Sequence, residues 1–250
     1  MQIGDAWKSL LRRAKPPPAR VPDGVRVYAV GDVHGCIDLL DQTLARIDRY
    51  RDAEPAASEI EVFLGDYVDR GAHSREVIDR LIERSRSRTA VCLMGNHELY
   101  LTEFLDDPAI FDDWKQFGGI ATLRSYGLPV AAASAEVAAD FATALRAALP
   151  ASHRDFLQSL KPSFTCGDYF FVHAGVRPGI PLAEQRVEDL LWIRQEFLGY
   201  DGDFGKVIVH GHTPVSTPDV RPNRINIDTG AYSTGQLTCL VLEADQLSFI

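Results

Sequence analysis

The chain has 250 residues, 46% of them hydrophobic, and a formal net charge of −9 at pH 7. This length and composition favour one large α/β domain with a substantial core. The acidic balance argues against a nucleic-acid groove, which depends on clustered Lys and Arg, and no segment approaches the roughly 20 apolar residues of a membrane-spanning helix.

The first 24 residues are expected to form a flexible, basic, proline-rich tail outside the folded domain. They carry Lys, Arg and the run Pro16–Pro18, but no continuous apolar segment of the kind found in a signal peptide. The four cysteines of the chain lie far apart and include no C-x-x-C pair. We therefore expect free thiols, a reducing compartment and a cytoplasmic location.

Short runs of β-branched and aromatic residues recur along the chain and predict strands. Helical patterns lie between the first three runs, and Ser74 is expected to be the N-cap of the second of these helices. The opening half is therefore predicted to alternate strand and helix. The predicted strands cover residues 25–30, 59–64, 89–94, 169–172, 206–209, 224–227 and 236–243.

One helical pattern follows another from about residue 99 to residue 162, and the clearest covers 136–149. We expect a helical insert within a single domain that spans residues 25–250. A further helix is predicted over 181–198. The last predicted strands are close enough in sequence to form antiparallel hairpins.

Polar residues gather where five of the predicted strands end. Each motif alone is ordinary turn chemistry, but five of the seven histidines stand in these motifs. Ligand sites in open α/β sheets form beyond the carboxyl ends of the strands, so the five motifs are expected to converge on one site. The motifs are GDVHG (31–35), GDYVDRG (65–71), GNHE (95–98), HAG (173–175) and HGHTP (210–214).

Asp, His and Asn supply oxygen and imidazole donors without thiolate. This set suits Mn²⁺, Fe or Zn²⁺ in a catalytic site and is poorly suited to a closed structural zinc site. A carboxylate such as Asp66 has two oxygens and can bridge two ions, and two-metal sites clamp the attacking and leaving oxygens of a phosphoryl transfer. We expect two divalent ions, with Mn²⁺ as the first candidate and Fe or Zn²⁺ as alternatives.

The motifs, in this order, resemble those of the calcineurin-like metallophosphoesterases, and more narrowly the bacterial and phage branch of the phosphoprotein phosphatase family. The resemblance extends from about Val25 to the C-terminus and is weakest in the helical insert. It implies two packed mixed β-sheets flanked by helices. It also implies hydrolysis of phosphate monoesters by a water molecule that two metal ions acidify to hydroxide, without a protein nucleophile.

The resemblance implies six metal ligands, with Asp66 as the bridge between two ions. Asp32 and His34 would share one ion with Asp66, and the others would share the second ion with it. The six are Asp32, His34, Asp66, Asn96, His173 and His212.

The resemblance further implies how the residues would act on substrate. His97 would be the general acid that protonates the leaving oxygen, and Asp69 would hydrogen-bond to it. Arg70 and Arg194 would bind the phosphate, together with Asn96. The substrate would be a phosphoprotein or another phosphate ester.

Three further histidines and one glutamate are less favoured as site residues. His210 is expected to be buried or to stand behind the ligands rather than to bind metal, and His153 to be structural. His73 is close enough to Arg70 in sequence to contact substrate, but an exposed residue at the start of a helix is the favoured interpretation. Glu98 is expected to orient its neighbours rather than react.

Several functions remain open at the level of sequence. A serine/threonine protein phosphatase is the main interpretation; the alternatives are a symmetrical bis(5′-nucleosyl)-tetraphosphatase, a phosphotyrosine phosphatase and a non-catalytic phosphate-binding scaffold. The related nucleases and phosphodiesterases have a G-H-x-H motif at this point, whose second histidine binds the first metal ion. Pro214 takes the place of that histidine here, which favours phosphate monoesters over diesters as substrates. Trp114, Phe117 and Tyr126 in the insert can stack a nucleobase, although aromatic residues at helical spacing are more often core.

Overall fold

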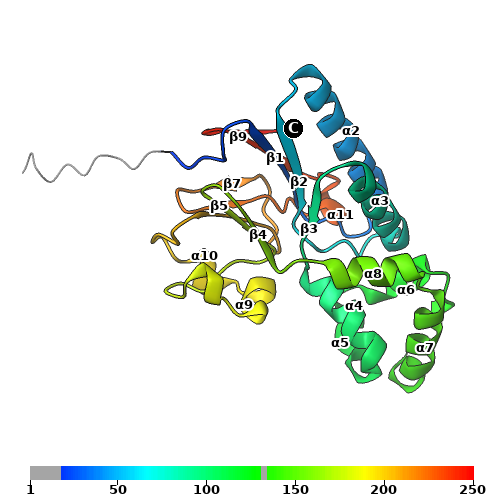
Figure 1. The fold of residues 1–250 in the computed structure, drawn as a ribbon. Coiled ribbons are helices and arrows are strands. Elements are labelled where there is room, and N and C mark those ends of the chain that lie inside the picture. The colour runs from blue at the N-terminus through cyan, green and yellow to red at the C-terminus, as the bar shows by residue number, and fades with distance from the viewer. Residues whose placement is uncertain (1–17, 131–133) are drawn as a thin grey trace, which may run out of the picture.

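The computed structural model describes residues 18–130 and 134–250 (Figure 1). Two five-stranded mixed sheets pack face to face, and helices cover their outer faces. The fold class expected from the sequence is therefore confirmed. Most of the expected N-terminal tail, residues 1–17, lies outside the described residues. Within the described part of the chain, no helix has the length and apolar character needed to cross a bilayer.

The first sheet carries three of the motifs at one edge. Its strand order is β10-β9-β1-β2-β3, with β1, β2 and β3 parallel and β9 antiparallel to β1. Val30 pairs with Phe63, and Phe63 pairs with Cys92, so the three parallel strands end side by side. The strands are β1 (Val25–Val30), β2 (Ser58–Phe63), β3 (Ala90–Cys92), β9 (Cys239–Glu243) and β10 (Gln246–Phe249).

The second sheet brings the other two motifs to the same place. Its order is β4-β5-β6-β8-β7, with β5, β6 and β8 parallel. Phe171, Val209 and Ile225 stand in register, so the segments that follow these strands are neighbours. The strands are β4 (Ser163–Cys166), β5 (Tyr169–Val172), β6 (Val207–His210), β7 (Asp219–Val220) and β8 (Arg224–Asn226).

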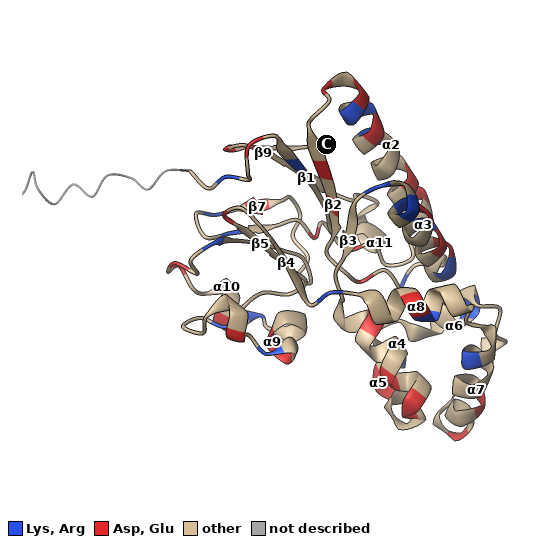
Figure 2. Cartoon of the chain, viewed as in Figure 1, with Lys and Arg blue, Asp and Glu red and all other residues tan. Residues whose placement is uncertain are grey.

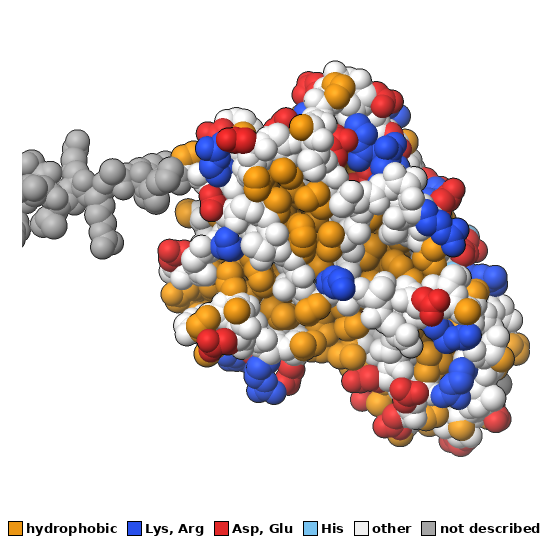
Figure 3. All heavy atoms as spheres, viewed as in Figure 1, with side chains coloured by type: hydrophobic (Ala, Val, Ile, Leu, Met, Phe, Trp, Pro, Cys, Tyr) orange, Lys and Arg blue, Asp and Glu red, His pale blue; other side chains and the backbone are white. Residues whose placement is uncertain are grey.

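Apolar side chains fill the space between the sheets and both outer layers. The inter-sheet core contains residues such as Val62, Phe171 and Leu240. Figure 3 shows apolar side chains reaching the surface over the strands on one face, with charged groups mostly around them. Figure 2 shows Lys and Arg interspersed with Asp and Glu on helices α2 (Ile37–Ala53) and α3 (Ser74–Ser87), which cover the first sheet.

The described residues of 96–130 and 134–159 are mostly helical and share one apolar cluster with α2 and α3. Trp114, Tyr126 and Phe156 of this segment belong to the same cluster as Leu40 and Val77. The insert therefore has no core separate from that of the first sheet. Its elements are α4 (Asn96–Asp106), η1 (Pro108–Ile110), α5 (Phe111–Gln116), α6 (Gly119–Ser125), η3 (Ala135–Val137), α7 (Ala138–Ala148) and α8 (Ala151–Ser159).

Two expectations about helices are wrong. The continuous helix expected over 181–198 is broken into η4 (Leu182–Glu184), α9 (Val187–Trp192) and α10 (Gln195–Leu198), and the break at Arg194 has φ −130° and ψ −92°. Ser74 is the first residue of α3 rather than its N-cap, because its hydroxyl accepts a hydrogen bond from the backbone N–H of Asp69. Both departures involve residues near the polar motifs: Ser74 hydrogen-bonds to Asp69, and Arg194 lines the cavity described below.

Candidate active site

The strand ends converge on a buried cluster centred on His173. His173 Nε2 lies 2.9 Å from Asn96 Oδ1, 3.1 Å from His212 Nδ1 and 3.4 Å from Asp66 Oδ1. His173 Nδ1 faces the carbonyl oxygen of Leu64 at 3.0 Å, which fixes the orientation of the ring. Four side chains from four separate segments therefore present donor atoms to one point.

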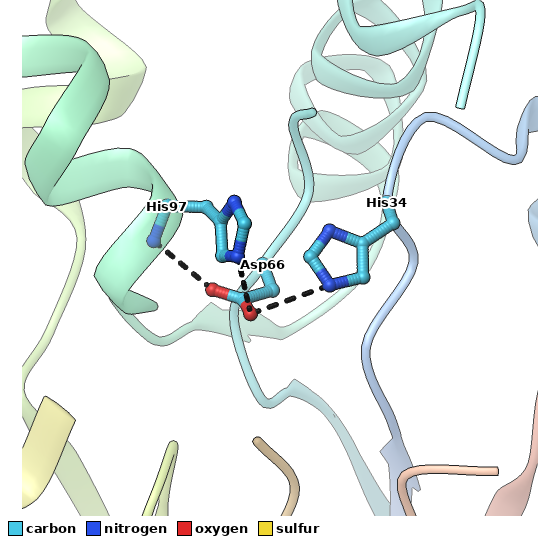
Figure 4. Close-up of side chains that lie close together, drawn as sticks. All are labelled: His34, Asp66 and His97. Carbon is cyan, nitrogen blue, oxygen red and sulfur yellow. Dashed lines mark hydrogen bonds and ion pairs between the residues drawn. The ribbon is translucent and has the colours of Figure 1, made fainter. Parts of the chain in front are cut away.

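A second group of donors meets the other oxygen of Asp66. His34 Nε2 lies 3.5 Å from Asp66 Oδ2, and His97 Nε2 lies 3.7 Å from the same oxygen. Figure 4 shows the two imidazoles on either side of the Asp66 carboxylate, whose other oxygen accepts a 3.2 Å hydrogen bond from the backbone N–H of His97. His34 Nδ1 faces the carbonyl oxygen of Val68 at 2.9 Å. Asp66 thus stands between two donor clusters.

Asp32 and His212 have buried polar atoms without partners among the described residues. Asp32 Oδ2 accepts a 3.0 Å hydrogen bond from the backbone N–H of His212, while Asp32 Oδ1 and His212 Nε2 are unpaired. A Cβ atom at Gly211 would collide with Asp32 Oδ1, and one at Gly95 would collide with Asp66 Oδ1. Leaving a buried polar atom unpaired costs roughly 1–3 kcal/mol, which indicates that these atoms face a missing partner.

Backbone strain is concentrated at the same strand ends. Among the described residues, six non-glycine residues have positive φ, and five of them belong to the site motifs. This left-handed conformation costs roughly 1–3 kcal/mol per residue and persists only where the surroundings hold it in place. The five are His34 (46°), Asp66 (53°), Asp69 (69°), Arg70 (64°) and His212 (64°).

Burial keeps three of the histidines neutral. It lowers the pKa of His34 to about 3, and it also lowers the pKa of His173 and of His212, with Asp66 compensating only in part. A neutral imidazole has a free lone pair, and this is the form that binds a metal ion. The environment therefore favours the ligand form of all three.

The carboxylates of the site crowd one another. Burial raises the pKa of Asp32 well above its ordinary value, and Asp228 and Asp66 raise it further. Burial also raises the pKa of Asp228 to about 6. Asp66 differs, because burial is outweighed by the charge that the surrounding histidines carry when protonated, and its pKa is lowered. Divalent cations would supply further positive charge to such a cluster of carboxylates.

These observations together fit divalent metal ions. Two groups of side chains have donor atoms close enough to share an ion, and they have Asp66 in common: His34, Asp66 and His97 form one, and Asp66, His173 and His212 form the other. The oxygen and imidazole donors suit Mn²⁺, Fe or Zn²⁺. Asp32 has a buried unpaired oxygen and is therefore a further candidate ligand beside His34 and Asp66.

His97 is held by Asp69, and Asp69 is held by the insert. His97 Nδ1 lies 2.7 Å from Asp69 Oδ2. Asp69 also accepts hydrogen bonds from Trp114 Nε1 at 2.9 Å and from Thr122 Oγ1 at 2.5 Å. Burial opposes the charged form of His97, but Asp66 and Asp69 outweigh burial and raise its pKa. His97 is therefore the one histidine of the cluster that its surroundings favour as a proton donor.

Glu98 organises the loop that carries Asp66. Its buried carboxylate accepts hydrogen bonds from four backbone N–H groups, those of Asp66, Tyr67, Val68 and Gly95, at 2.7–3.2 Å. The expectation that Glu98 orients its neighbours is confirmed.

Two arginines, Arg70 and Arg194, line the cavity and have guanidinium N–H groups that no carboxylate engages among the described residues. Arg70 Nη2 lies 3.4 Å from His97 Nε2, and its guanidinium lies 4.7 Å from the ring centre of Tyr232. Arg194 is exposed, and its Nη1 donates to Thr213 Oγ1 at 3.2 Å. Within residues 18–130 and 134–250, neither arginine forms an ion pair with a carboxylate. Both are therefore free to bind an anion.

The structure brings all ten predicted site residues together. Eight of them line one small cavity of about 30 Å³, and Asp69 and His173 stand directly behind it. The cavity also contains three residues absent from the predicted site list: Phe117, Trp192 and Asp228. Asp228 follows β8, so the strand-end signal that identified the other motifs points to it as well. The eight predicted lining residues are Asp32, His34, Asp66, Arg70, Asn96, His97, Arg194 and His212.

The remaining histidines lie outside the cluster. His210 is buried against Phe197, and His73 is exposed at the start of α3, as expected. His153 is buried and lies 2.7 Å from the Tyr126 hydroxyl, which confirms a structural role. Trp114 and Tyr126 are also buried, so of the two interpretations of these aromatic residues the core one holds for both.

Comparisons with known proteins agree with this geometry. The family model for calcineurin-like phosphoesterases matches residues 25–246. The asymmetrical bis(5′-nucleosyl)-tetraphosphatase PrpE of Halalkalibacterium halodurans is 29% identical over 230 residues, which cover 84% of this chain and 87% of that protein. A symmetrical bis(5′-nucleosyl)-tetraphosphatase of Dechloromonas aromatica is 32% identical over 151 residues, 60% of this chain and 44% of that protein. A solved cold-active protein tyrosine phosphatase has a similar fold, with a TM-score of 0.58, 18% identity and coverage of 92% of this chain and 78% of that chain.

Proposed function

The chain belongs to the calcineurin-like phosphoesterase family, and from that premise we propose that it hydrolyses bis(5′-nucleosyl) tetraphosphates with the help of two divalent metal ions. The relatives support this substrate, because both curated proteins named above are tetraphosphatases. The sequence analysis favoured a serine/threonine protein phosphatase and gave a symmetrical bis(5′-nucleosyl)-tetraphosphatase and a phosphotyrosine phosphatase as alternatives. The relatives favour a tetraphosphatase, of the asymmetrical or the symmetrical kind, and give the serine/threonine protein phosphatase no specific support.

The position of Asp66 between two donor clusters carries the proposed chemistry. Asp32 and His34 would complete one metal site with it. When bound, two such ions would supply the charge that activates water and stabilises the oxygens around phosphorus. The second site would be completed by Asn96, His173 and His212.

Arg70 and Arg194 would bind the phosphate chain. Both line the cavity, and a guanidinium presents its N–H groups in a fork that matches phosphate oxygens. A tetraphosphate carries several negative charges, and the protein as a whole is acidic. The two arginines and the metal ions therefore give the local positive charge that such a substrate needs.

His97 would give a proton to the leaving oxygen. Its Nδ1 faces Asp69, which leaves Nε2 directed toward the cavity beside Arg70. In a tetraphosphate the departing group is itself a phosphate, which leaves more easily than an alcohol. We therefore expect His97 to contribute less to anhydride cleavage than to cleavage of an alkyl phosphate.

The relative that matches along most of both chains is of the asymmetrical kind. Asymmetrical cleavage of diadenosine tetraphosphate gives ATP and AMP, whereas symmetrical cleavage gives two molecules of ADP. We propose the asymmetrical outcome for this chain.

The test is a hydrolysis panel on the purified, Mn²⁺-loaded protein. Diadenosine tetraphosphate is compared with phosphoserine, phosphothreonine and phosphotyrosine peptides, and the nucleotide products are separated by chromatography. We expect a higher kcat/KM on the dinucleotide, with ATP and AMP as products, and loss of activity with a chelator. More efficient hydrolysis of the peptides would contradict the proposed substrate, and release of ADP alone would contradict the cleavage position.

A further inference from the structure

The cavity at the centre of the site is too small for a whole substrate. Its volume is about 30 Å³, far below the roughly 300–1,000 Å³ of pockets that enclose a drug-sized ligand. Only the reacting atoms can enter it, and the rest of any substrate must lie across its mouth. The chemistry of the mouth therefore decides which substrates bind well.

Aromatic rings stand around this mouth, each in edge contact with a histidine of the site. The ring centre of Phe117 lies 6.1 Å from that of His97, and the ring centre of Trp192 lies 6.2 Å from that of His212. On another side, Tyr232 lies 5.4 Å from His34. Such rings offer flat apolar surface next to the anion-binding arginines.

Phe117 is the ring best placed to receive a planar group. It is 37% exposed although Tyr100 stacks on one of its faces, with ring centres 5.1 Å apart and planes at 25°. Trp192 contacts it at an angle of 67°, with a centre separation of 6.3 Å. Tyr100 covers one face and Trp192 contacts the ring at an angle, so the two neighbours hold the ring in place while part of it stays exposed.

The backbone next to Phe117 ties this ring to the phosphate-binding loop. Gly118 has φ +106°, and its carbonyl oxygen accepts a 3.4 Å hydrogen bond from the backbone N–H of Arg70. A Cβ atom at Gly118 would stand 2.8 Å from that nitrogen, so a side chain there would push the two loops apart. The exposed part of the Phe117 ring is thus positioned relative to the guanidinium that we expect on the phosphates.

Tyr232 does not offer the same surface. It is 44% exposed, but the Arg70 guanidinium lies over its ring at 4.7 Å. Its ring is therefore engaged with a cation, whereas none of the cation–π contacts among the described residues involves Phe117.

We propose that the exposed part of the Phe117 ring, backed by Tyr100, is the stacking subsite for the nucleobase nearest to the scissile anhydride. The proposal rests on the proposed function, because the base belongs to a dinucleoside tetraphosphate. A base stacked on Phe117 would lie near His97, since the two ring centres are 6.1 Å apart. This suits asymmetrical cleavage, in which the broken bond joins the second phosphate to the phosphate that carries the nucleoside. Stacking is tolerant of base identity, so the subsite accepts purines in general.

Selectivity between two substrates tests the subsite. We compare kcat/KM for diadenosine tetraphosphate and for inorganic tripolyphosphate, which has no base. Phe117→Leu keeps apolar contact with Tyr100 but removes the flat face, and it is expected to lower the ratio of the two values about tenfold. Phe117→Trp is expected to keep the ratio. Phe249→Leu changes a 40% exposed phenylalanine on β10 and serves as the matched control, with no change expected.

Binding of AMP to the Mn²⁺-loaded protein, measured by calorimetry, separates the subsite from the proposed function. We expect Phe117→Leu to weaken AMP about tenfold and inorganic phosphate much less. If the wild type binds AMP in this way but does not cleave the dinucleotide, the proposed function falls and the subsite stands. If the dinucleotide is cleaved but Phe117→Leu changes neither the ratio nor AMP binding, the subsite is overturned. Failure of the wild type to bind AMP, or equal dependence of phosphotyrosine peptides on Phe117, also overturns it.

Discussion

The two walls of the site are built by different means. One wall consists of strand ends, where residues such as Asp66 and His173 come within three residues of the ends of β2 and β5. The other wall belongs to the helical insert, and its contribution comes from single side chains: Trp114 and Thr122 hydrogen-bond to Asp69, and Phe117 lies beside His97.

Because of this difference, we expect the two walls to serve two functions, catalysis and the selection of substrate. Strand ends are fixed by the ladders of both sheets, so donor atoms on them cannot shift without disrupting the fold. Side chains of the insert can change one at a time while the sheets stay intact. We therefore expect the strand-end wall to control metal binding, and the insert wall to control the orientation of the acid and the selection of substrate.

The largest expected effect comes from the strand-end wall. Asp66→Asn removes the charge and one of the two oxygens shared between the donor clusters. We expect loss of at least one metal ion and a decrease in kcat of at least about 10³-fold. Metal analysis and steady-state kinetics measure the two effects. Asp219→Asn, which breaks an exposed ion pair with Arg221, is the control; full metal occupancy in Asp66→Asn would refute the bridging role.

The next largest effect tests whether His97 acts as a general acid and not as a metal ligand. His97→Asn is expected to lower kcat on an alkyl phosphate by about 10²–10³-fold with metal content retained, because the variant cannot donate the proton that an alkoxide needs. On the tetraphosphate, whose leaving group is a phosphate, we expect a smaller loss. Equal losses on both substrates would argue against the acid role, and loss of metal would place His97 among the ligands.

The strand-end wall was accessible from sequence because its signals are local. Each motif is a short run directly after an apolar segment, and the register that aligns Val30, Phe63 and Cys92 follows from the parallel pairing of a strand–helix repeat. Asp228 carries the same signal but stands alone in its segment, without a histidine to draw attention to it.

The insert wall was not accessible in the same way. Nothing near Trp114 in sequence indicates that its indole N–H reaches Asp69, and helical spacing suggests a core residue, which it also is. The break before Arg194 has the same origin, because the local pattern favours a continuous helix and only the assembled pocket accounts for the turn. Contacts between distant segments have no periodicity to reveal them.

Trp114→Phe tests whether the insert orients the acid. It removes one donor to Asp69 and is expected to lower kcat on an alkyl phosphate about tenfold without loss of metal, and to cost about 2 kcal/mol of stability. Tyr126→Phe is the matched control: it removes a buried hydrogen bond to His153 in the same insert, at a comparable cost of about 1–3 kcal/mol. If both variants lower kcat equally, the effect is general destabilisation and not orientation of the acid.

The smallest expected effect concerns Tyr232, which belongs to neither wall. The guanidinium of Arg70 lies over its ring, and this contact helps to orient Arg70. A cation over an exposed aromatic ring gains roughly 0.5–1 kcal/mol, so Tyr232→Leu is expected to raise KM about threefold and to leave kcat within about twofold. Tyr232→Phe keeps the ring and should retain the wild-type KM. If Phe behaves like Leu, the hydroxyl acts on the substrate directly, and Arg70 is then oriented by its own loop, whose positive φ and contact with Gly118 already restrict it.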